Sequence, residues 1–172
     1  MRVGVVGLGY WGPNLARNFD ALPGTELRWL CDASEPARAR WAPQFPGARV
    51  TDDLDELLSD GALDAVVVAT QVPTHAQLAL RVLAAGKHCF VEKPLAQSVS
   101  EAEQVVAAAH DSRRVLMVGH LLEYHPGVER IKELADSGAL GRIHYLYSNR
   151  LNLGQLRQDE NALWSLGAHD VS

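Results

Sequence analysis

Three glycines near the N-terminus stand at a spacing that suits the binding of a dinucleotide. Gly7, Gly9 and Gly12 form a G-x-G-x-x-G pattern in the stretch VGVVGLGYWGPN. In such a turn the first glycine allows a tight bend, the second lets a pyrophosphate approach the backbone, and the third lets a helix pack closely on a strand. The following helix offers N–H groups and the positive end of its dipole to the phosphates. We predict that these glycines, with the adjacent Tyr10 and Trp11, bind a nicotinamide dinucleotide.

An acidic residue stands where the adenosine ribose of that dinucleotide would lie. Asp32 ends the apolar run ELRWLC and follows Gly12 by twenty residues. A carboxylate there accepts hydrogen bonds from both ribose hydroxyls and repels a 2′-phosphate, which favours NAD over NADP. Alternatives stay open: the glycines form only a tight turn, Asp32 is only a helix N-cap, or the nearby Arg38 and Arg40 accommodate a 2′-phosphate.

A lysine precedes a proline in the stretch VEKPLA, at the end of an expected strand. Ligands of open parallel sheets bind outside the carboxyl ends of the strands, so Lys93 would be aimed at the nicotinamide. A lysine in such a cleft can hydrogen-bond a reacting hydroxyl and share in proton transfer. Pro94 can fix the local backbone, also through a cis bond. The alternative is a solvated lysine on a loop.

A histidine near the end of the chain is the second candidate for proton transfer. His169 stands in NALWSLGAHDVS, beside an aspartate and four residues after Ser165. Residues four apart lie on one face of a helix, so the serine hydroxyl could reach the imidazole. A surface histidine beside a helix start is the alternative reading. Seven histidines are present, but only His120 and His125 stand close together, and neither belongs to a familiar zinc pattern, so we predict no metal site.

Alternating β-strands and α-helices must position these residues. Short β-branched runs alternate with alanine- and leucine-rich segments of helical period, which predicts an α/β fold with a doubly wound parallel sheet. The expected strands are 2–7, 26–32, 48–50, 63–70, 87–93 and 115–120. The expected helices are 11–19, 35–44, 54–58, 74–85, 100–110 and 127–137, followed by a new strand in GRIHYLYSNRLNLG. Ser100 and Glu103 would form a capping box.

The acidic stretch TDDLDELLSD carries three leucines at helical spacing, which indicates an amphipathic helix rather than a metal site.

The composition favours a small-molecule partner. The chain has 172 residues, of which 47% are hydrophobic, and a net charge of −5, so it can bury a core but lacks the basic balance of a nucleic-acid-binding protein. Two cysteines stand in apolar runs and read as core residues of a reducing compartment. No segment approaches the length of a membrane helix or has the form of a secretory leader, so we expect a cytoplasmic protein without membrane contact.

Six stretches together resemble the glucose-fructose oxidoreductase / inositol dehydrogenase (Gfo/Idh/MocA) family. They are GLGYWGPNLARNF, TDDLDELL, DAVVVATQVPTH, AAGKHCFVEKPLA, IKELADSGALGRIHYLYSNRLNLG and the final HD. The resemblance is strongest to the branch of nucleotide-sugar 3-dehydrogenases and sugar 3-ketoreductases. It implies an NAD(P)-binding Rossmann domain over residues 1–120 and, from 121 to 172, the start of an α/β domain with an open antiparallel sheet that forms substrate and oligomer surfaces.

The resemblance also implies roles for individual residues. Lys93 and His169 would act at the reacting hydroxyl while hydride moves between a sugar carbon and nicotinamide. The cofactor contacts would be Gly7, Gly9, Tyr10, Trp11, Gly12, Asp32, Thr70, His75, Glu92 and Lys93. The substrate contacts would be Lys93, Arg150, Asn152, Ser165 and His169. For His75, a structural role at a helix start is an equal alternative.

Two residues depart from the family pattern. Gln71 replaces the usual proline, and Ser165 replaces the aspartate or asparagine that commonly stands four residues before the histidine. Serine keeps a hydrogen bond but brings no charge to support an imidazolium.

The final segment is too short for a second domain, because a sheet needs three or more strands with a covered face to stand alone. We therefore expect a partial sequence of a protein that forms a homo-oligomer when complete. A non-catalytic dinucleotide-binding protein, an inactive fragment and a dehydrogenase of inositol or another free polyol are the alternatives.

Overall fold

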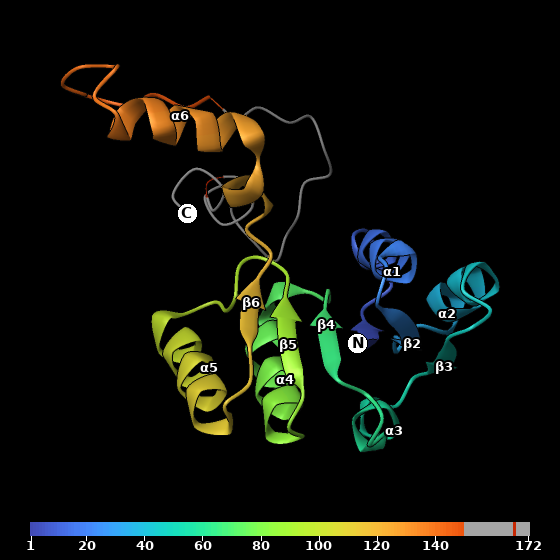
Figure 1. Cartoon of the computed structure of the whole chain (residues 1–172). Coiled ribbons are helices and arrows are strands. Elements are labelled where there is room, and N and C mark those ends of the chain that lie inside the picture. The colour runs from blue at the N-terminus through green and yellow to red at the C-terminus, as the bar shows by residue number, and fades with distance from the viewer. Residues whose placement is uncertain (150–166, 168–172) are drawn as a thin grey trace. The chain divides into compact units, whose positions relative to one another are not determined.

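The chain divides into two units, Met1–Gly119 and His120–Ser172, in a computed structural model that describes residues 1–149 and 167 (Figure 1). The first unit contains the predicted sheet. Its six strands are β1 (Arg2–Val6), β2 (Glu26–Cys31), β3 (Arg49–Thr51), β4 (Ala65–Val68), β5 (His88–Val91) and β6 (Leu116–Val118). All neighbouring strands pair in parallel, in the order β3-β2-β1-β4-β5-β6. This order reverses between β1 and β4, and such a reversal opens a crevice at the carboxyl ends of the strands.

Helices cover both faces of the sheet. They are α1 (Gly12–Ala21), α2 (Glu35–Trp41), α3 (Leu54–Ser59), α4 (Val72–Ala84) and α5 (Val99–Ser112), with a 3₁₀ turn at Ala42–Gln44. One buried cluster joins α3, α4 and α5 to one face, and a second joins α1 and α2 to the other. Each helix connects two parallel strands, as a crossover requires. The predicted doubly wound α/β fold of Rossmann type is therefore confirmed.

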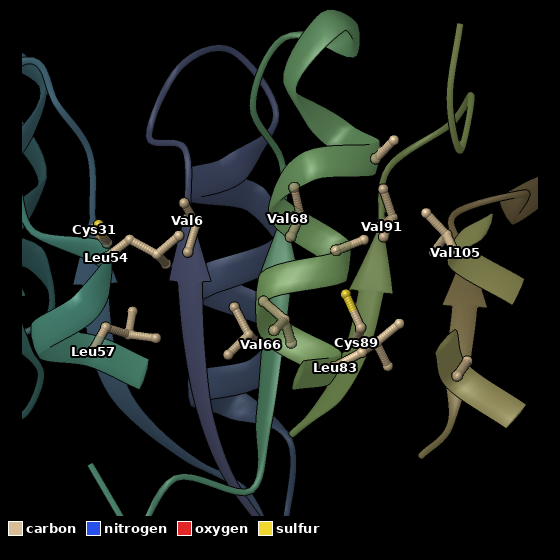
Figure 2. Close-up of a cluster of buried hydrophobic side chains, with 14 of the residues drawn as sticks. Val6, Cys31, Leu54, Leu57, Val66, Val68, Leu83, Cys89, Val91 and Val105 are labelled. Carbon is tan, nitrogen blue, oxygen red and sulfur yellow. The ribbon is translucent and has the colours of Figure 1, made fainter. Parts of the chain in front are cut away.

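The central strand β4 supplies apolar side chains to both layers. Val66 and Val68 belong to the cluster under α3, α4 and α5, while Val67 between them belongs to the cluster under α1 and α2. Figure 2 shows Val66 and Val68 beside Val91 of β5 and Leu83 of α4. Successive strand residues face opposite sides, so a strand buried on both faces reads as an unbroken apolar run. This burial holds the carboxyl end of β4 rigidly at the crevice.

One predicted helix cap is wrong in detail, and one alternative for Asp32 is excluded. The capping box lies at Ser98 and Glu101 rather than at Ser100 and Glu103, because the extended backbone of Ser98 lets its hydroxyl accept the Glu101 N–H. The stretch SVSEAE offers the S-x-x-E pattern twice, and only the first copy precedes the helix. Asp32 is not the N-cap of α2, since Ser34 holds that position. The amphipathic helix α3 is confirmed: Leu54 and Leu57 are buried on it.

The second unit contains a 3₁₀ turn at Leu121–Tyr124 and the helix α6 (Pro126–Asp136). The side chain of His125 caps α6 by accepting the N–H of Gly127 at 3.0 Å. The strand predicted after Gly141 does not form in residues 142–149, where the backbone is irregular. A strand needs a partner to hydrogen-bond with, and the described part of this unit contains no other strand. Within residues 1–149 no helix is long and apolar enough to cross a membrane.

Candidate dinucleotide site

The carboxyl ends of β1, β4 and β5 bring most of the predicted site residues to one edge of the sheet. The glycine-rich turn follows β1, Thr70 follows β4, and Glu92 and Lys93 follow β5. The strands are direct neighbours, with Val6 opposite Val68 and Val68 opposite Val91 in the parallel register. Segments that lie far apart in the sequence thus converge where the topology predicts a ligand crevice.

The glycine-rich turn needs its glycines for different physical reasons. Gly7 has a φ of +97°, and a Cβ there would lie 2.6 Å from the carbonyl oxygen of Ala69. A Cβ on Gly12 would lie 1.8 Å from the carbonyl oxygen of Gly7, so the start of α1 touches the turn itself. A Cβ on Gly9 would meet no atom within 4 Å. Gly7 and Gly12 therefore maintain the fold, whereas Gly9 leaves the turn bare for an approaching group.

The start of α1 presents backbone groups without a competing acid. Its N-cap Trp11 makes no side-chain capping bond, and the first turn contains no acidic residue. The rings of Tyr10 and Trp11 stack with their centroids 6.5 Å apart, and Tyr10 is 85% exposed. An uncapped helix start next to an open turn suits the anionic pyrophosphate of a dinucleotide. The residues present therefore fit the predicted cofactor.

Asp32 holds the turn from the end of β2. Its Oδ2 atom accepts the N–H of Leu8 at 2.6 Å, and its Oδ1 atom accepts the N–H of Ser34 at 2.7 Å. A carboxylate has about four lone-pair directions, so two remain for further donors. The side chain is partly exposed. Asp32 can thus fix the turn and still receive a ribose diol.

Arg38 lies beside Asp32 but binds the protein itself. Its Nη1 atom donates to the carbonyl oxygens of Asp32 at 2.6 Å and Ala33 at 3.0 Å. Its Nη2 atom pairs with the carboxylate of Asp52 at 3.3 Å. A guanidinium engaged by two carbonyls and a carboxylate has fewer donors left for a 2′-phosphate.

Thr70 and His75 connect the loop that follows β4 to the rest of the site. The hydroxyls of Thr70 and Thr74 lie 2.7 Å apart across the first turn of α4. His75 is 1% exposed. Its Nδ1 atom lies 2.8 Å from the carbonyl oxygen of Pro94, and its Nε2 atom lies 3.1 Å from the carbonyl oxygen of Thr70. The imidazole therefore stands behind the edge of the sheet, between two loops.

Glu92 lies at the centre of this edge. Its Oε2 atom accepts the backbone N–H of Lys93 at 3.3 Å. Burial raises the pKa of the Glu92 carboxyl, while the Lys93 N–H, the Lys93 charge and the Trp11 indole oppose that rise. A Cβ on Gly119 would lie 3.0 Å from the Oε1 atom of Glu92. The carboxyl thus packs between the lysine loop, the glycine-rich turn and the end of β6.

Lys93 is half-buried and precedes a cis proline, which confirms the cis bond considered for Pro94. The remaining predicted site residues lie outside the described residues: Arg150, Asn152, Ser165 and His169. Their placement in a catalytic site stays a prediction. No group of three metal-ligating side chains occurs within the described residues.

Three residues of this edge were missing from the prediction. Leu8 donates the N–H that Asp32 accepts, Thr74 meets Thr70, and Gly119 makes room for Glu92. Only Gly119 offers a signal in the sequence, since a glycine near the carboxyl end of an expected strand permits a close approach. The other two act through a backbone group and a common hydroxyl, which no spacing singles out.

Comparison with known proteins identifies a family match over the first unit. Residues 1–120 match the family GFO_IDH_MocA, described as an oxidoreductase family with an NAD-binding Rossmann fold. Inositol 2-dehydrogenase 2 of Saccharopolyspora erythraea is 34% identical over 175 residues, a match that covers 99% of this chain and 52% of that protein. The chain therefore spans about half the length of this curated relative.

Two solved structures resemble the chain in fold and sequence. One is GenD2 from gentamicin A biosynthesis, solved in complex with NAD. The match has a TM-score of 0.77 and 42% sequence identity, and it covers 81% of this chain and 40% of the GenD2 chain. KijD10, a 3-ketoreductase from Actinomadura kijaniata solved with NADP and TDP-benzene, has a TM-score of 0.74 and 29% identity over 80% of this chain and 42% of its own.

Proposed function

We propose, from the premise that this chain belongs to the Gfo/Idh/MocA oxidoreductase family, that the protein transfers hydride between NAD and a sugar carbon. The single observation that supports this most is the convergence of the glycine-rich turn and Lys93 at one sheet edge. The open position at Gly9 suits the pyrophosphate. The half-buried Lys93 follows β5, which is separated in the sheet from β1, the strand before the turn, by β4 alone. Both lie where an open parallel sheet binds its ligands.

The reaction divides among this chain's own residues and the cofactor. The nicotinamide of bound NAD supplies the hydride acceptor or, in its reduced form, the donor. Lys93 would hold the oxygen of the reacting carbon by donating a hydrogen bond, which orients the carbon for hydride loss. His169 would take the hydroxyl proton in oxidation and return it in reduction. Ser165 would orient the imidazole, and Arg150 and Asn152 would contact the sugar.

NAD is the proposed cofactor because of the contacts around the adenosine ribose position. Asp32 keeps lone-pair directions for two ribose hydroxyls while it binds two backbone N–H groups. Arg38 is engaged by two carbonyls and by Asp52. The Asp32 carboxylate would repel a 2′-phosphate, and the guanidinium of Arg38 already makes hydrogen bonds and an ion pair within the protein. Because KijD10, a similar protein, was solved with NADP, the affinities of this protein for NAD and for NADP should both be measured.

The proposed substrate is a nucleotide-linked hexose that reacts at C3. The likeness to a 3-ketoreductase solved with TDP-benzene supports both the position and the nucleotide. The likeness to an inositol 2-dehydrogenase supports a free polyol as the second candidate. The region from residue 121 onward would begin the domain that chooses between them and forms the homo-oligomer.

A panel of substrates tests this function. The protein is incubated with NAD and, separately, with UDP- and TDP-hexoses, free hexoses and myo-inositol, and reduced nicotinamide is followed by absorbance. We expect turnover with a nucleotide-linked hexose and an oxidised product at C3 by mass spectrometry and NMR. Turnover with myo-inositol alone supports the second candidate. NAD binding without turnover on any member of the panel would contradict the proposed catalysis.

A further inference from the structure

His75 joins the two loops that carry the catalytic edge. It is 1% exposed and projects from the first turns of α4. Its two ring nitrogens face backbone carbonyls of different segments: Pro94 at 2.8 Å and Thr70 at 3.1 Å. Thr70 lies in the loop after β4, and Pro94 lies directly after Lys93. One imidazole thus connects the loop after β4 to the loop that bears the lysine.

The sheet does not fix these loops at this point. The backbone bond from the Glu92 N–H to the Val68 carbonyl, 2.9 Å long, lies at the end of the β4–β5 ladder. Thr70 and Pro94 lie two residues beyond it. Past the end of a ladder, buried carbonyls need other partners, and a side-chain donor can supply them. The His75 ring occupies that position.

The two contacts of the His75 ring bear on which of its nitrogens carries the proton. A neutral imidazole has one N–H donor and one acceptor nitrogen, whereas both of its neighbours here are carbonyl acceptors. The shorter contact belongs to the Nδ1 atom, and a donating N–H gives distances near 2.9 Å. A neutral ring with its proton on Nδ1 would donate to the Pro94 carbonyl through the shorter contact, and its Nε2 atom would make the longer contact with Thr70.

We propose that His75 is a positioning residue for Lys93, whose Nδ1–H holds the Pro94 carbonyl and so fixes the backbone that carries the lysine. The sequence predicts a cofactor contact for His75, with a structural role at a helix start as an equal alternative, and this proposal develops the structural role. The role deepens the proposed hydride transfer and rests on it for its catalytic meaning. A residue that orients a reacting group in this way acts through geometry, and a small misplacement lowers turnover.

Three substitutions separate this role from simple packing. His75→Asn places an amide donor near the position of Nδ1, His75→Gln places one near the position of Nε2, and His75→Phe keeps a ring without any donor. His110→Asn is the matched control, since the His110 side chain is 90% exposed. Thermal unfolding establishes which variants fold. If His75→Phe does not fold, the comparison of His75→Asn with His75→Gln decides.

NMR provides a readout that does not depend on activity. The chain has three lysines, Lys87, Lys93 and Lys132, so a protein labelled with ¹³C at lysine Cε gives few signals, and Lys93→Arg assigns the one in question. In the wild-type protein, ¹⁵N shifts of the His75 ring should show a protonated Nδ1. We expect the Lys93 signal to keep its position in His75→Asn and His110→Asn and to move in His75→Gln and His75→Phe.

Turnover gives a second, separate readout. With a sugar that the panel identifies, His75→Gln should lose about tenfold or more in turnover while His75→Asn stays within about threefold, and both should keep NADH affinity within about threefold. A protonated Nε2, or equal Lys93 shifts in the Asn and Gln variants, would overturn the positioning role. If the whole panel fails, the proposed function falls, and the NMR comparison still decides the role of His75.

Discussion

The Oδ2 atom of Asp32 accepts the backbone N–H of Leu8 at 2.6 Å, so the acid at the end of β2 is tied directly to the glycine-rich turn. The carboxylate that would bind the ribose thus also shapes the place where the phosphates would lie. In Asp32→Asn one oxygen remains to accept a backbone N–H, but the negative charge and one acceptor are lost. We expect the dissociation constant for NADH to rise about tenfold and the preference over NADPH to shrink.

A neighbouring acid provides the matched control for this change. Asp52→Asn removes the same charge from a residue that pairs with Arg38 at 3.3 Å and makes no proposed ribose contact. It should leave the NADH dissociation constant within about twofold, since the Asp52 side chain is 64% exposed and lies outside the proposed ribose contact. Calorimetric titration of both cofactors measures these constants. Equal losses in the two variants would show that Asp32 acts only through its charge.

The glycines of the turn should separate binding from folding. Gly9→Ala adds a methyl group that meets no atom within 4 Å, so the fold should keep its Tm while NADH binding weakens about tenfold or more. Gly12→Ala places a Cβ 1.8 Å from the Gly7 carbonyl oxygen, and the overlap should lower the Tm by about 5 °C or more.

Gly47→Ala is the control for both glycine substitutions, because it also meets no atom within 4 Å and lies away from the turn. Thermal unfolding and NADH fluorescence titration give the two quantities. Full NADH affinity in Gly9→Ala would argue against a phosphate at this position.

Asp60 should make stability depend on pH. Its Oδ2 atom accepts the Nε–H of Arg28 at 2.6 Å and the indole N–H of Trp29 at 2.8 Å, and its Oδ1 atom accepts the N–H of Ala62 at 2.9 Å. The hydrogen bond from Arg28, followed by those from Trp29 and Ala62, lowers the pKa of the carboxyl. A lowered folded-state pKa adds stability above the unfolded-state pKa of about 4, and this stability is lost as the pH falls toward the folded value.

Asp60→Asn tests this dependence. The variant should lose about 1–3 kcal/mol of unfolding free energy near neutral pH, because it leaves partly buried donors without their charged acceptor. The difference from the wild-type protein should shrink below about pH 4. Urea unfolding across this range measures it, with Asp20→Asn on the exposed side of α1 as control. A difference that stays constant with pH would contradict the assignment.

The two cysteines should be inert in the folded protein. Burial raises the pKa of the Cys89 thiol to about 12. Burial and then the charge of Asp32 raise that of Cys31 to about 11. Because the thiolate is the reactive form, neither should be alkylated by iodoacetamide under native conditions, and both should react in urea. Mass spectrometry counts the modified thiols. Rapid native labelling of either residue would refute this expectation.

The sequence predicts the sheet well because β4 and its neighbours follow a simple rule. An apolar run such as Ala65–Val68 has to be buried on both faces, and helical segments on either side supply the cover. The boundaries are less predictable. The strand expected over 63–70 shortens to Ala65–Val68, and the capping box moves to Ser98, because local geometry chooses between equivalent patterns.

The site is only partly predictable for a related reason. Glycine spacing and the acid after β2 indicate a dinucleotide because each residue type has a distinct physical task. His75 carries no such mark, since a histidine near a helix start has several uses. Its connection to Pro94, nineteen residues further along, appears only when β4 and β5 bring their loops together. A contact between a side chain and a backbone carbonyl produces no pattern of residue types or spacings in the sequence, so it cannot be predicted from the sequence.

The most direct test of the central claim compares Lys93→Ala with the wild-type protein. If Lys93 holds the reacting oxygen next to NAD, the variant should lose about a hundredfold or more in NAD reduction with the active sugar while it binds NADH within about threefold. Lys87→Ala is not a suitable control, because the buried Lys87 ammonium donates to the Asp60 carbonyl at 2.9 Å, whereas Lys132→Ala on α6 is exposed. Wild-type turnover in Lys93→Ala would contradict the account.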